Sequence, residues 1–435
     1  MTVDIRSWIL VAPLAISLCP AAAETSGEPR SLTLDQAIET ALANNPRLRQ
    51  SAIEISVAET RVKQARADLL PQIDAGGLAN KGLTGSANLF DLHGLASSPE
   101  PRNGAFSVNL LQDLLDFKRT KFESRARRAE VEYFEQTLRA DQDRLVLEVQ
   151  RAYFYGLKAS KHFALAGERI KRRELEQARA DALLEAELGA KVEVDQARAN
   201  LSKAQSGLTS ATEAQKRALS GLGTVIGEEA PVLYQLHEPE FSERIPDPLE
   251  PLVANSLEAR AELAAVNARI QAAEEWVRRA QREKYPRLMI MFSGGWTRFA
   301  ELTLGRLLFG AFGLQLPVFT GGRLEASIEE TKLVVDKTEA MRDELRQAIR
   351  LEVTSAHSEV VSTLEAVQAA RQGVEQAQAM ATLADIRQQQ GLSSRLDVVV
   401  ARTELAAAEN SLHQARYDYQ LATAQLEFAS GAASP

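Results

Sequence analysis

The residue types that most often carry chemistry are sparse in this chain. Its 435 residues include one cysteine and five histidines. A zinc site commonly shows its histidine and cysteine ligands at short, regular spacings, whereas these histidines are scattered over positions 93, 162, 237, 357 and 413. The sequence also contains no nucleophile elbow, P-loop or dinucleotide-binding fingerprint. We therefore predict that the protein is not an enzyme and holds neither a metal nor a cofactor.

The composition favours long helices. Aromatic residues make up 6% of the chain, while alanine, leucine, glutamate, arginine and glutamine are abundant. That balance is typical of extended helices rather than of a compact aromatic core. The net charge of -8 at pH 7 argues against a general nucleic-acid binder, so we expect no nucleic-acid partner.

The N-terminal segment, residues 1–23, resembles a secretory signal peptide. Arg6 precedes an apolar run, and the three alanines that end at Ala23 offer a cleavage site. Lipidation at Cys19 is the alternative, although Leu18 stands where a lipoprotein signal has a small residue. After residue 24 no apolar run reaches 18 residues, so we expect no transmembrane helix.

The two halves of the chain repeat each other. Some residues recur 215 positions later and others 204 positions later, for example Leu48, Ala58 and Pro71 as Leu263, Ala273 and Pro286, and Arg119, Glu148 and Gly227 as Arg323, Glu352 and Gly431. A proline-rich linker at 228–251 separates the copies. We predict two structural repeats, at 24–227 and 252–435, packed with pseudo-symmetry. Such a duplication suits a symmetric wall or duct better than a catalytic cleft.

Each repeat has the same predicted order of elements. The first has a helix over 34–70 with Thr33 or Ser31 as N-cap, a β-hairpin at 72–116, and helices at 118–188 and 191–221. The second has a helix at 252–285, strands at 287–298 and 306–317, and helices at 323–390 and 394–429. The last helix of each repeat carries an a/d heptad seam, which begins at Val194 and Val398 and is broken only by Gln215.

The predicted strands point to a membrane. Each has about 10 to 12 residues, the length of a tilted membrane strand. Four strands cannot close a barrel, and open edges cannot face lipid. If the strands enter a membrane, several chains must therefore contribute. The extra residues of the first repeat fall near 91–102, where they would lengthen an exterior loop. A soluble hairpin packed on helices remains the alternative.

Several short motifs, in this order, resemble the TolC-type outer membrane efflux protein family. They are Leu32-Thr33-Leu34-Asp35-Gln36-Ala37, Asn44-Asn45-Pro46, Leu69-Leu70-Pro71, Leu316-Pro317-Val318-Phe319-Thr320-Gly321-Gly322-Arg323 and Leu396-Asp397-Val398. The resemblance implies a mainly α fold with a small β part, in which long coiled-coil helices form an α-barrel tunnel. Four strands from each chain would join a trimeric, 12-stranded membrane β-barrel. One departure is the segment 112–117, where the family has a Gly-Gly turn.

The resemblance also implies functional sites. Asp397 matches a family position whose carboxylates ring the closed tunnel mouth, and Glu193 and Asp195 lie at the other hairpin tip. The tips that would dock a periplasmic adaptor are Gly189 and Ala190 in the first repeat and Gly391, Leu392 and Ser393 in the second. The alternative for these acids is a solvated helix end. Trp296 and Phe299 suit a membrane interface.

The expected function is passive conduction. A homotrimer in the outer membrane, with a long periplasmic portion, would serve a tripartite efflux pump or a type I secretion system. An adaptor would favour the open state, and an inner-membrane transporter of RND or ABC type would supply the energy. The alternative function is a soluble periplasmic coiled-coil scaffold or adaptor. The sequence does not identify the cargo.

Overall fold

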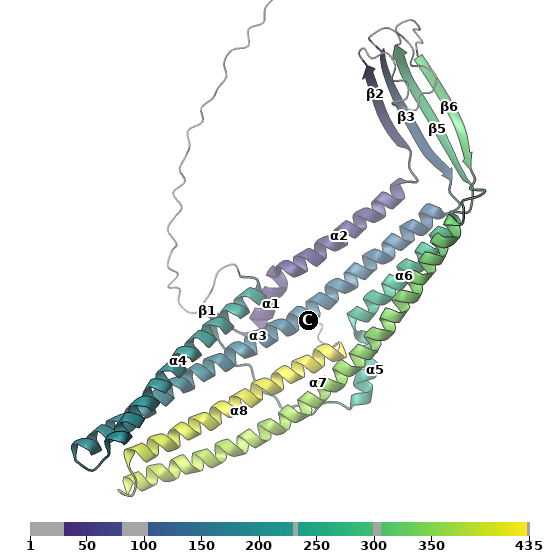
Figure 1. Ribbon diagram of the computed structural model, residues 1–435. Coiled ribbons are helices and arrows are strands. Elements are labelled where there is room, and N and C mark those ends of the chain that lie inside the picture. Colours follow the sequence, from purple (N-terminus) through teal and green to yellow (C-terminus); the bar gives the residue numbers. More distant parts are fainter. Residues whose placement is uncertain (1–29, 81–102, 229–233, 299–305, 433–435) are drawn as a thin grey trace, which may run out of the picture.

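The computed structural model describes residues 30–80, 103–228, 234–298 and 306–432. It shows an elongated molecule with a small β-sheet at one end and two long helical hairpins that end side by side at the other (Figure 1). The predicted signal peptide at 1–23, the segment 91–102 and Phe299 lie outside the described residues. In the described part, no helix combines the length and apolar character needed to cross a membrane.

The first repeat begins with a broken helix. The predicted helix over 34–70 is wrong as a single element, because it is α1 (Leu34–Asn44) followed by α2 (Pro46–Ala67). Asn45 between them is extended (φ -66°, ψ 122°), as expected of a residue before proline, which disfavours the helical region. Thr33 caps α1 through a reciprocal capping box with Gln36.

The remaining elements of the first repeat lie close to their predicted bounds. Strands β2 (Gln72–Asn80) and β3 (Asn103–Leu115) form the hairpin. Helix α3 (Arg119–Glu185) is the long helix, and α4 (Lys191–Ile226) returns along it. Gln215, which breaks the heptad pattern, donates a hydrogen bond to Ser160 Oγ of α3 (3.1 Å), so the polar residue in the seam has a partner.

The second repeat copies the first. Here too the predicted helix at 252–285 is broken, into α5 (Leu249–Ala259) and α6 (Ala261–Arg282). Strands β5 (Arg287–Arg298) and β6 (Arg306–Gln315) are followed by α7 (Arg323–Gln389) and α8 (Arg395–Ser430). The heptad seam of α8 packs on α7, where Tyr419, Ala422 and Leu426 join a buried cluster with Val353 and Val360.

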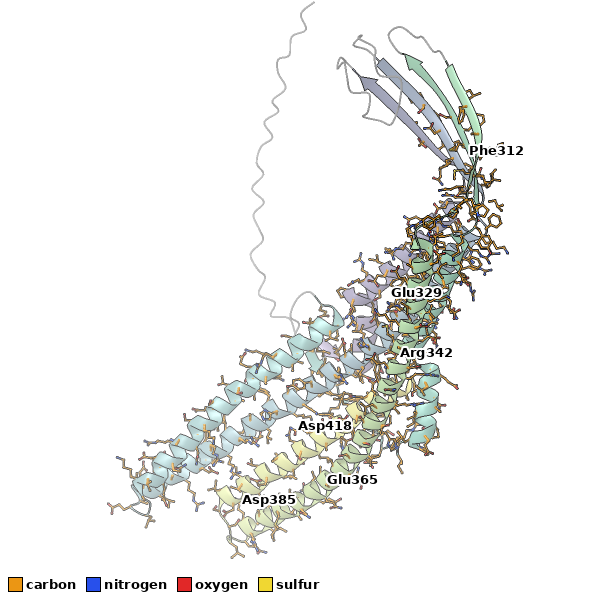
Figure 2. All side chains as sticks on the ribbon, turned by 45° about the vertical axis from the view of Figure 1, so that its right-hand side comes forward. Phe312, Glu329, Arg342, Glu365, Asp385 and Asp418 are labelled. Carbon is orange, nitrogen blue, oxygen red and sulfur yellow. The ribbon has the colours of Figure 1, made fainter. Side chains whose placement is uncertain are left out.

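The four-stranded sheet has two chemically different faces. Its order is β2-β3-β5-β6, and all neighbours are antiparallel. One face carries a polar row, in which Asn109 donates to Asp74 (2.9 Å) and Ser293 donates to Asn109 (2.7 Å). The opposite face is apolar, and its Ile73, Leu308 and Phe312 are 69%, 77% and 74% exposed; Figure 2 labels Phe312. The face with the polar row is mixed, because Leu111, Met291 and Phe309 lie on it too. An exposed, almost wholly apolar face on the other side is the pattern of the lipid-facing wall of a membrane barrel.

The segment between the repeats is bound to the helices. It contains β4 (Tyr234–Leu236), which pairs in parallel with β1 (Arg30–Leu32). The Tyr153 hydroxyl lies 2.6 Å from the carbonyl oxygen of His237. The Tyr419 hydroxyl donates to the carbonyl of Arg244 (2.6 Å) and accepts from its amide (2.9 Å). Residues 237–248 therefore form a strap across the helices, held on both α3 and α8.

The sheet joins both long helices through the same turn. Gly321 and Gly322 precede α7 with φ of 61° and 84°, and Phe117 and Lys118 precede α3 with φ of 50° and 72°. The first joint thus keeps the conformation although it lacks glycines. The Asp116 carboxylate accepts hydrogen bonds from the amides of Lys118 (3.0 Å) and Thr120 (2.7 Å), and these bonds hold the turn.

Candidate functional site

The two hairpin tips have the same backbone turn. The amide of Leu188 donates to the carbonyl of Leu183 (2.9 Å), and the amide of Leu392, 204 positions later, donates to that of Arg387 (2.8 Å). The leucine at each apex is largely exposed, by 79% for Leu188 and 73% for Leu392. Each tip therefore presents one apolar side chain beyond the end of its hairpin.

The glycines of the two tips have different roles. Gly391 adopts φ 73°, and Glu187 has the equivalent conformation at φ 56°. The left-handed residue of the first tip is therefore Glu187 and not Gly189. A Cβ on Gly189 would lie 3.1 Å from Leu183 Cβ, so this glycine permits the close approach of the chain. The equivalent of Gly189 is Ser393, whose hydroxyl donates to the carbonyl of Ala384 (3.4 Å).

The carboxylates of Glu193 and Asp397 occupy the third position of α4 and α8. Asp397 Oδ2 accepts hydrogen bonds from the amide and the hydroxyl of Ser394, both 2.8 Å, and its own amide donates to Ser394 Oγ (3.2 Å). Glu193 Oε2 accepts from the amide of Ala190 (3.2 Å). Ala190 has no side-chain acceptor, so the first tip has half of the capping box that the second tip completes.

The electrostatics of the second tip keep Asp397 ionised. Hydrogen bonds from the backbone and side chain of Ser394 lower the pKa of its carboxyl, and the nearby charge of Arg179 contributes in the same direction. Asp397 is exposed. A fixed, ionised carboxylate that remains open to solvent can attract cations as well as cap a helix.

Matched ion pairs stiffen both hairpins just behind the tips. Arg198 Nη2 lies 3.3 Å from Asp181 Oδ1, and Arg402 Nη2 lies 3.1 Å from Asp385 Oδ1. Figure 2 labels Asp385 near the end of the second hairpin. These residues are again 204 positions apart. The sequence motifs did not indicate these ion pairs, although Arg198 and Arg402 recur at the 204-residue offset.

The other predicted site residues are less closely related. Asp195 is exposed on α4. It lies two positions beyond Glu193, so the two carboxylates are on nearly opposite sides of the helix. Ala190 is exposed and Ser393 is partly exposed. Trp296 is in β5, where it pairs with Phe106 of β3.

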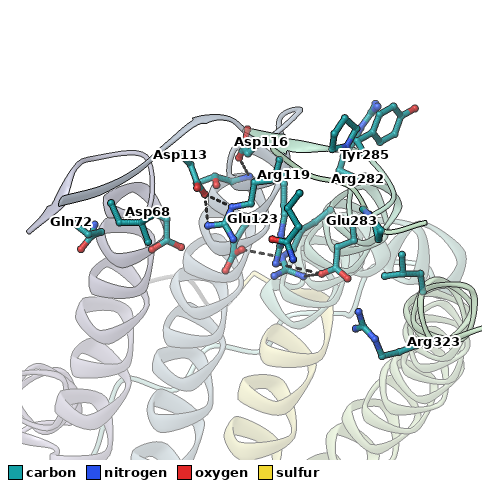
Figure 3. Close-up of a pocket in the computed structure, with 18 residues that line it drawn as sticks. Asp68, Gln72, Asp113, Asp116, Arg119, Glu123, Arg282, Glu283, Tyr285 and Arg323 are labelled. Carbon is teal, nitrogen blue, oxygen red and sulfur yellow. Dashed lines mark hydrogen bonds and ion pairs between the residues drawn. The ribbon is translucent and has the colours of Figure 1, made fainter. Parts of the chain in front are cut away.

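A second polar cluster lies where the sheet meets the helices (Figure 3). Arg287 pairs with Asp113 (2.5 Å), and Arg279 pairs with both Glu123 and Glu283 (2.9 Å each). Acids and arginines are thus paired in the wall of this pocket, which marks it as a structural joint. In the described ranges, no group of three or more histidine, cysteine or acidic side chains is arranged to hold a metal ion.

Paired helical hairpins, matched tips and a sheet with one exposed apolar face fit a membrane protein that inserts strands into lipid and extends long helices beyond it. Residues 37–228 and 252–432 match the family model described as outer membrane efflux protein, and the chain belongs to this family. It functions as an outer-membrane efflux channel with a long periplasmic portion. The family is one of channels rather than enzymes, and the soluble scaffold is not favoured.

Similar proteins cover nearly the whole chain. Outer membrane protein TolC of Escherichia coli (strain K12) is 24% identical over 416 residues, which are 92% of this chain and 82% of TolC. The outer membrane efflux protein BepC of Brucella suis biovar 1 (strain 1330) is 24% identical over 405 residues, 92% of this chain and 86% of BepC. The solved outer-membrane channel OprN has a TM-score of 0.72 at 20% identity, covering 92% of this chain and 89% of that chain.

Proposed function

We propose that three copies of this chain close head to tail into the channel, each copy contributing two repeats, at 24–227 and 252–435. The observation that carries this proposal is a break in the internal symmetry. In α6, Ala268 and Ala272 are each 4% exposed, and Ala268 lies beside α3. Their equivalents in α2, 215 positions earlier, are Ile53 and Val57, which are larger, apolar and 54% and 45% exposed.

The complementary surface lies on α7. In α3, Glu130 faces α6 and accepts a hydrogen bond from Trp276 Nε1 (3.2 Å). Its equivalent in α7 is Val334, which is 47% exposed beside Leu333, 59% exposed. By symmetry, α7 of one copy would contact α2 of the next as α3 contacts α6 within a copy. Both surfaces have apolar residues where the internal contact has polar or small ones.

The edges of the sheet support the same head-to-tail order of the copies. Strands β2 and β6 are its two edges, and unpaired edges are not tolerated in lipid. Joining β6 of each copy to β2 of the next satisfies both edges and, with three copies, gives 12 strands. The apolar face would then contact outer-membrane lipid, and the row of Asp74, Asn109 and Ser293 would face the lumen.

At the opposite end, the tips would form the mouth of the channel. We infer that three copies of Asp397 make a carboxylate ring, with Glu193 of the first tip as its internal counterpart. Such a ring favours cations and hinders anions. Because nothing in the chain resembles a nucleotide site, cargo would move passively, driven by an inner-membrane transporter of RND or ABC type.

A periplasmic adaptor would bind the tips. The exposed Leu188 and Leu392 offer matched apolar contacts, six in a ring of three copies, and Gly189, Ala190, Gly391 and Ser393 surround them. Replacing both leucines with serine should abolish adaptor-dependent efflux in the native host while leaving the amount of outer-membrane trimer unchanged. Unchanged efflux would remove the apical leucines from the docking surface.

Assembly is tested by fractionating cells and running detergent-extracted outer membranes on gels with and without heating. We expect a heat-sensitive trimer. Val57→Asp would place an unpaired carboxylate in the proposed α2–α7 contact and should abolish the trimer. Ser56→Asp is the control, because Ser56 and its equivalent Gln271 are both exposed. A trimer that tolerates Val57→Asp would contradict this interface.

The mouth is tested by ion selectivity in planar bilayers. Asp397→Asn keeps an acceptor oxygen for Ser394 but removes the charge, so it should lower the preference for cations. Glu185→Gln, the same change of charge on an exposed residue at the end of α3, is the control. Equal selectivity in the wild type and Asp397→Asn would exclude Asp397 from the mouth and leave it as a helix cap.

A further inference from the structure

Three basic side chains form a row on one face of α3, close to the sheet. All three are exposed, and we call them the basic row: Lys121, Arg125 and Arg128. Their spacing of four and three residues places them on a single face of the helix. Arg127, which lies between them in the sequence, pairs with Glu130 (2.9 Å). By contrast, no member of the basic row forms an ion pair with any other described residue. The charge of the row is therefore available to a partner.

The basic row lies on the same side of the molecule as the apolar face of the sheet. Asp113 is four residues beyond Asn109 on β3, so it is on the face that carries the polar row. Arg119 and Glu123 of α3 line the pocket at the joint together with Asp113 (Figure 3). On a helix with about 3.6 residues per turn, the basic row and these two residues occupy opposite sides. The row therefore faces away from the polar side of the sheet and toward the lipid side.

The basic row also lies at the level of lipid headgroups. Leu115 ends β3 and is 48% exposed, and α3 begins at Arg119. At about 1.5 Å per residue, even Arg128 is only roughly 14 Å below the start of α3. Side chains on a helix lean toward its N-terminus, which for α3 is the end at the sheet. Long basic side chains in this position extend their charges toward the membrane surface.

Local contacts prepare this face for an anion. The guanidinium carbon of Arg125 lies 5.9 Å from the centre of the Phe122 ring. Stacking of this kind orients the planar group and leaves its N–H donors available. The positive end of the α3 dipole is at the same end of the helix. Lys118, exposed in the turn before α3, adds a further cation. Phosphate diesters, which accept paired N–H bonds from arginine, are the matching chemistry.

The second repeat lacks the basic row. At the 204-residue offset, α7 carries Glu325, Glu329 and Lys332. Two acids and one lysine give these three positions a net charge of -1, against +3 for the basic row. Glu325 pairs with Lys284 (3.0 Å), and Glu329, labelled in Figure 2, is exposed. Two helices that leave the sheet through the same turn thus carry opposite charge, so the fold itself does not require the basic row.

We propose that the basic row binds the phosphate groups of anionic phospholipids, such as phosphatidylglycerol, in the periplasmic leaflet of the outer membrane. The proposal rests on the contact between the apolar face of the sheet and lipid that is proposed above. Basic residues next to a membrane are attracted to anionic lipids, and salt screens this attraction. The net charge of the whole chain is -8, so a preference for an anionic lipid has to come from a local surface. Each copy of the chain would hold one such site, directly below its lipid-facing strands.

The test measures lipid binding by the full-length channel in detergent. Phosphatidylglycerol with a fluorophore on one acyl chain is titrated with the channel, and binding is followed by fluorescence anisotropy. Phosphatidylcholine with the same chains and label is the reference, because its headgroup has no net charge. The titrations are repeated at higher salt, and with inorganic phosphate at the concentration of the lipid as a competitor.

Two triple variants remove the same three charges. The first neutralises the basic row and consists of Lys121→Gln, Arg125→Gln and Arg128→Gln. The matched control neutralises exposed cations farther from the sheet and consists of Arg144→Gln, Arg169→Gln and Lys203→Gln. A single variant, Glu329→Arg, adds a cation to the equivalent face of α7 and does not disturb the row.

We expect the wild type to bind phosphatidylglycerol at least tenfold more tightly than phosphatidylcholine, with a preference that shrinks as salt is added. Neutralising the basic row should weaken binding of phosphatidylglycerol at least fivefold, whereas the matched control should stay within about twofold of the wild type. Glu329→Arg should tighten binding at least twofold. Equal affinity for the two lipids, an unchanged affinity of the row variant or an equal loss in the control would overturn the proposal. Displacement of the lipid by inorganic phosphate would also overturn it, in favour of a site for free anions.

Assembly is scored separately by the heat-sensitive trimer. A wild type that forms this trimer without preferring phosphatidylglycerol would contradict the lipid site and leave the proposed channel intact, whereas absence of the trimer would contradict the channel assembly. If the row variant itself forms no trimer, Glu329→Arg decides, and an unchanged affinity for phosphatidylglycerol in that variant would contradict the proposal.

Discussion

Glu187 and Gly391 occupy the same left-handed position in the two hairpin tips, with φ of 56° and 73°. The two turns are otherwise alike in their hydrogen bonds and in the exposed leucine that follows. A side chain with a Cβ in this conformation costs roughly 1–2 kcal/mol, whereas glycine adopts it readily. The first tip therefore stores backbone strain that the second tip lacks.

Glu187→Gly should stabilise the channel by about 1 kcal/mol, because relief of the strain is partly offset by the greater entropy of the unfolded chain. Gly391→Ala is the reciprocal variant and should destabilise it by about 1 kcal/mol. Both are measured as shifts of the denaturant midpoint in detergent, followed by circular dichroism. If Glu187→Gly destabilises, the glutamate side chain makes a contact worth more than the strain.

The turn before α3 should respond in the same way. Lys118 has φ 72° where its equivalent Gly322 has φ 84°, so Lys118→Gly should raise the unfolding free energy by about 1 kcal/mol. Lys118 is preferable to Phe117 for this test, because the Phe117 ring stacks on Tyr285 at 5.5 Å. Gly322→Lys should lower the unfolding free energy. The conductance of each variant shows whether the joint still supports an intact channel. Equal midpoints for Lys118→Gly and the wild type would show that the joint carries no strain.

Much of the fold was predictable because the duplication presents each element twice, so that one copy checks the prediction made for the other. The strand bounds 287–298 agree with β5 residue for residue, and the heptad seam of α8 packs on α7 as expected. These elements depend on local periodicity, which the sequence displays directly. The exposed apolar side chains Leu308 and Phe312 of β6 lie four residues apart, so the alternation of a strand places them on one face.

The breaks between paired helices were not predictable from periodicity. Arg260 interrupts α5 and α6 without a proline, in an extended conformation (φ -65°, ψ 123°). Its cause is tertiary, since Gly431 at the end of α8 packs there, where a Cβ would approach Ala259 Cβ to 2.9 Å. At the tips, Gly189 serves a close approach and Gly391 a turn, two uses of glycine that look alike in a sequence. Only the structure separates these uses.

Arg260 is the buried centre of that break. It is 5% exposed and pairs with Glu262 (2.8 Å) and Glu352 (2.6 Å), and its guanidinium lies 4.7 Å from the Phe428 ring centre. Arg260→Met would leave two acids unpaired and should destabilise the channel by about 3 kcal/mol. Arg278→Met removes an exposed arginine that also pairs with two glutamates and should cost less than about 1 kcal/mol. Similar midpoints for both variants would contradict a special role for the buried arginine.

His413 makes the stability of the strap depend on pH. Burial lowers the pKa of its imidazole, and the charge of Lys161 on α3 adds to this. Arg416 on α8 also lowers it, whereas Glu238 of the strap and Glu409 of α8 oppose the shift. The unfolded chain therefore binds a proton near pH 6.5 before the folded chain does, and stability falls as the pH drops below that value.

His413→Gln removes this proton uptake and should flatten the pH dependence. We expect the midpoint of thermal unfolding in detergent to fall less for the variant than for the wild type between pH 7 and pH 5. The pKa of Glu238 is lowered by its hydrogen bond to Lys161, so protonation of this carboxylate destabilises both proteins as the pH falls further. His162→Gln, which replaces an exposed imidazole on α3, is the control for replacing an imidazole. Parallel pH curves for the wild type and His413→Gln would show that the imidazole is not the titrating group, and that acid weakens the strap through Glu238 alone.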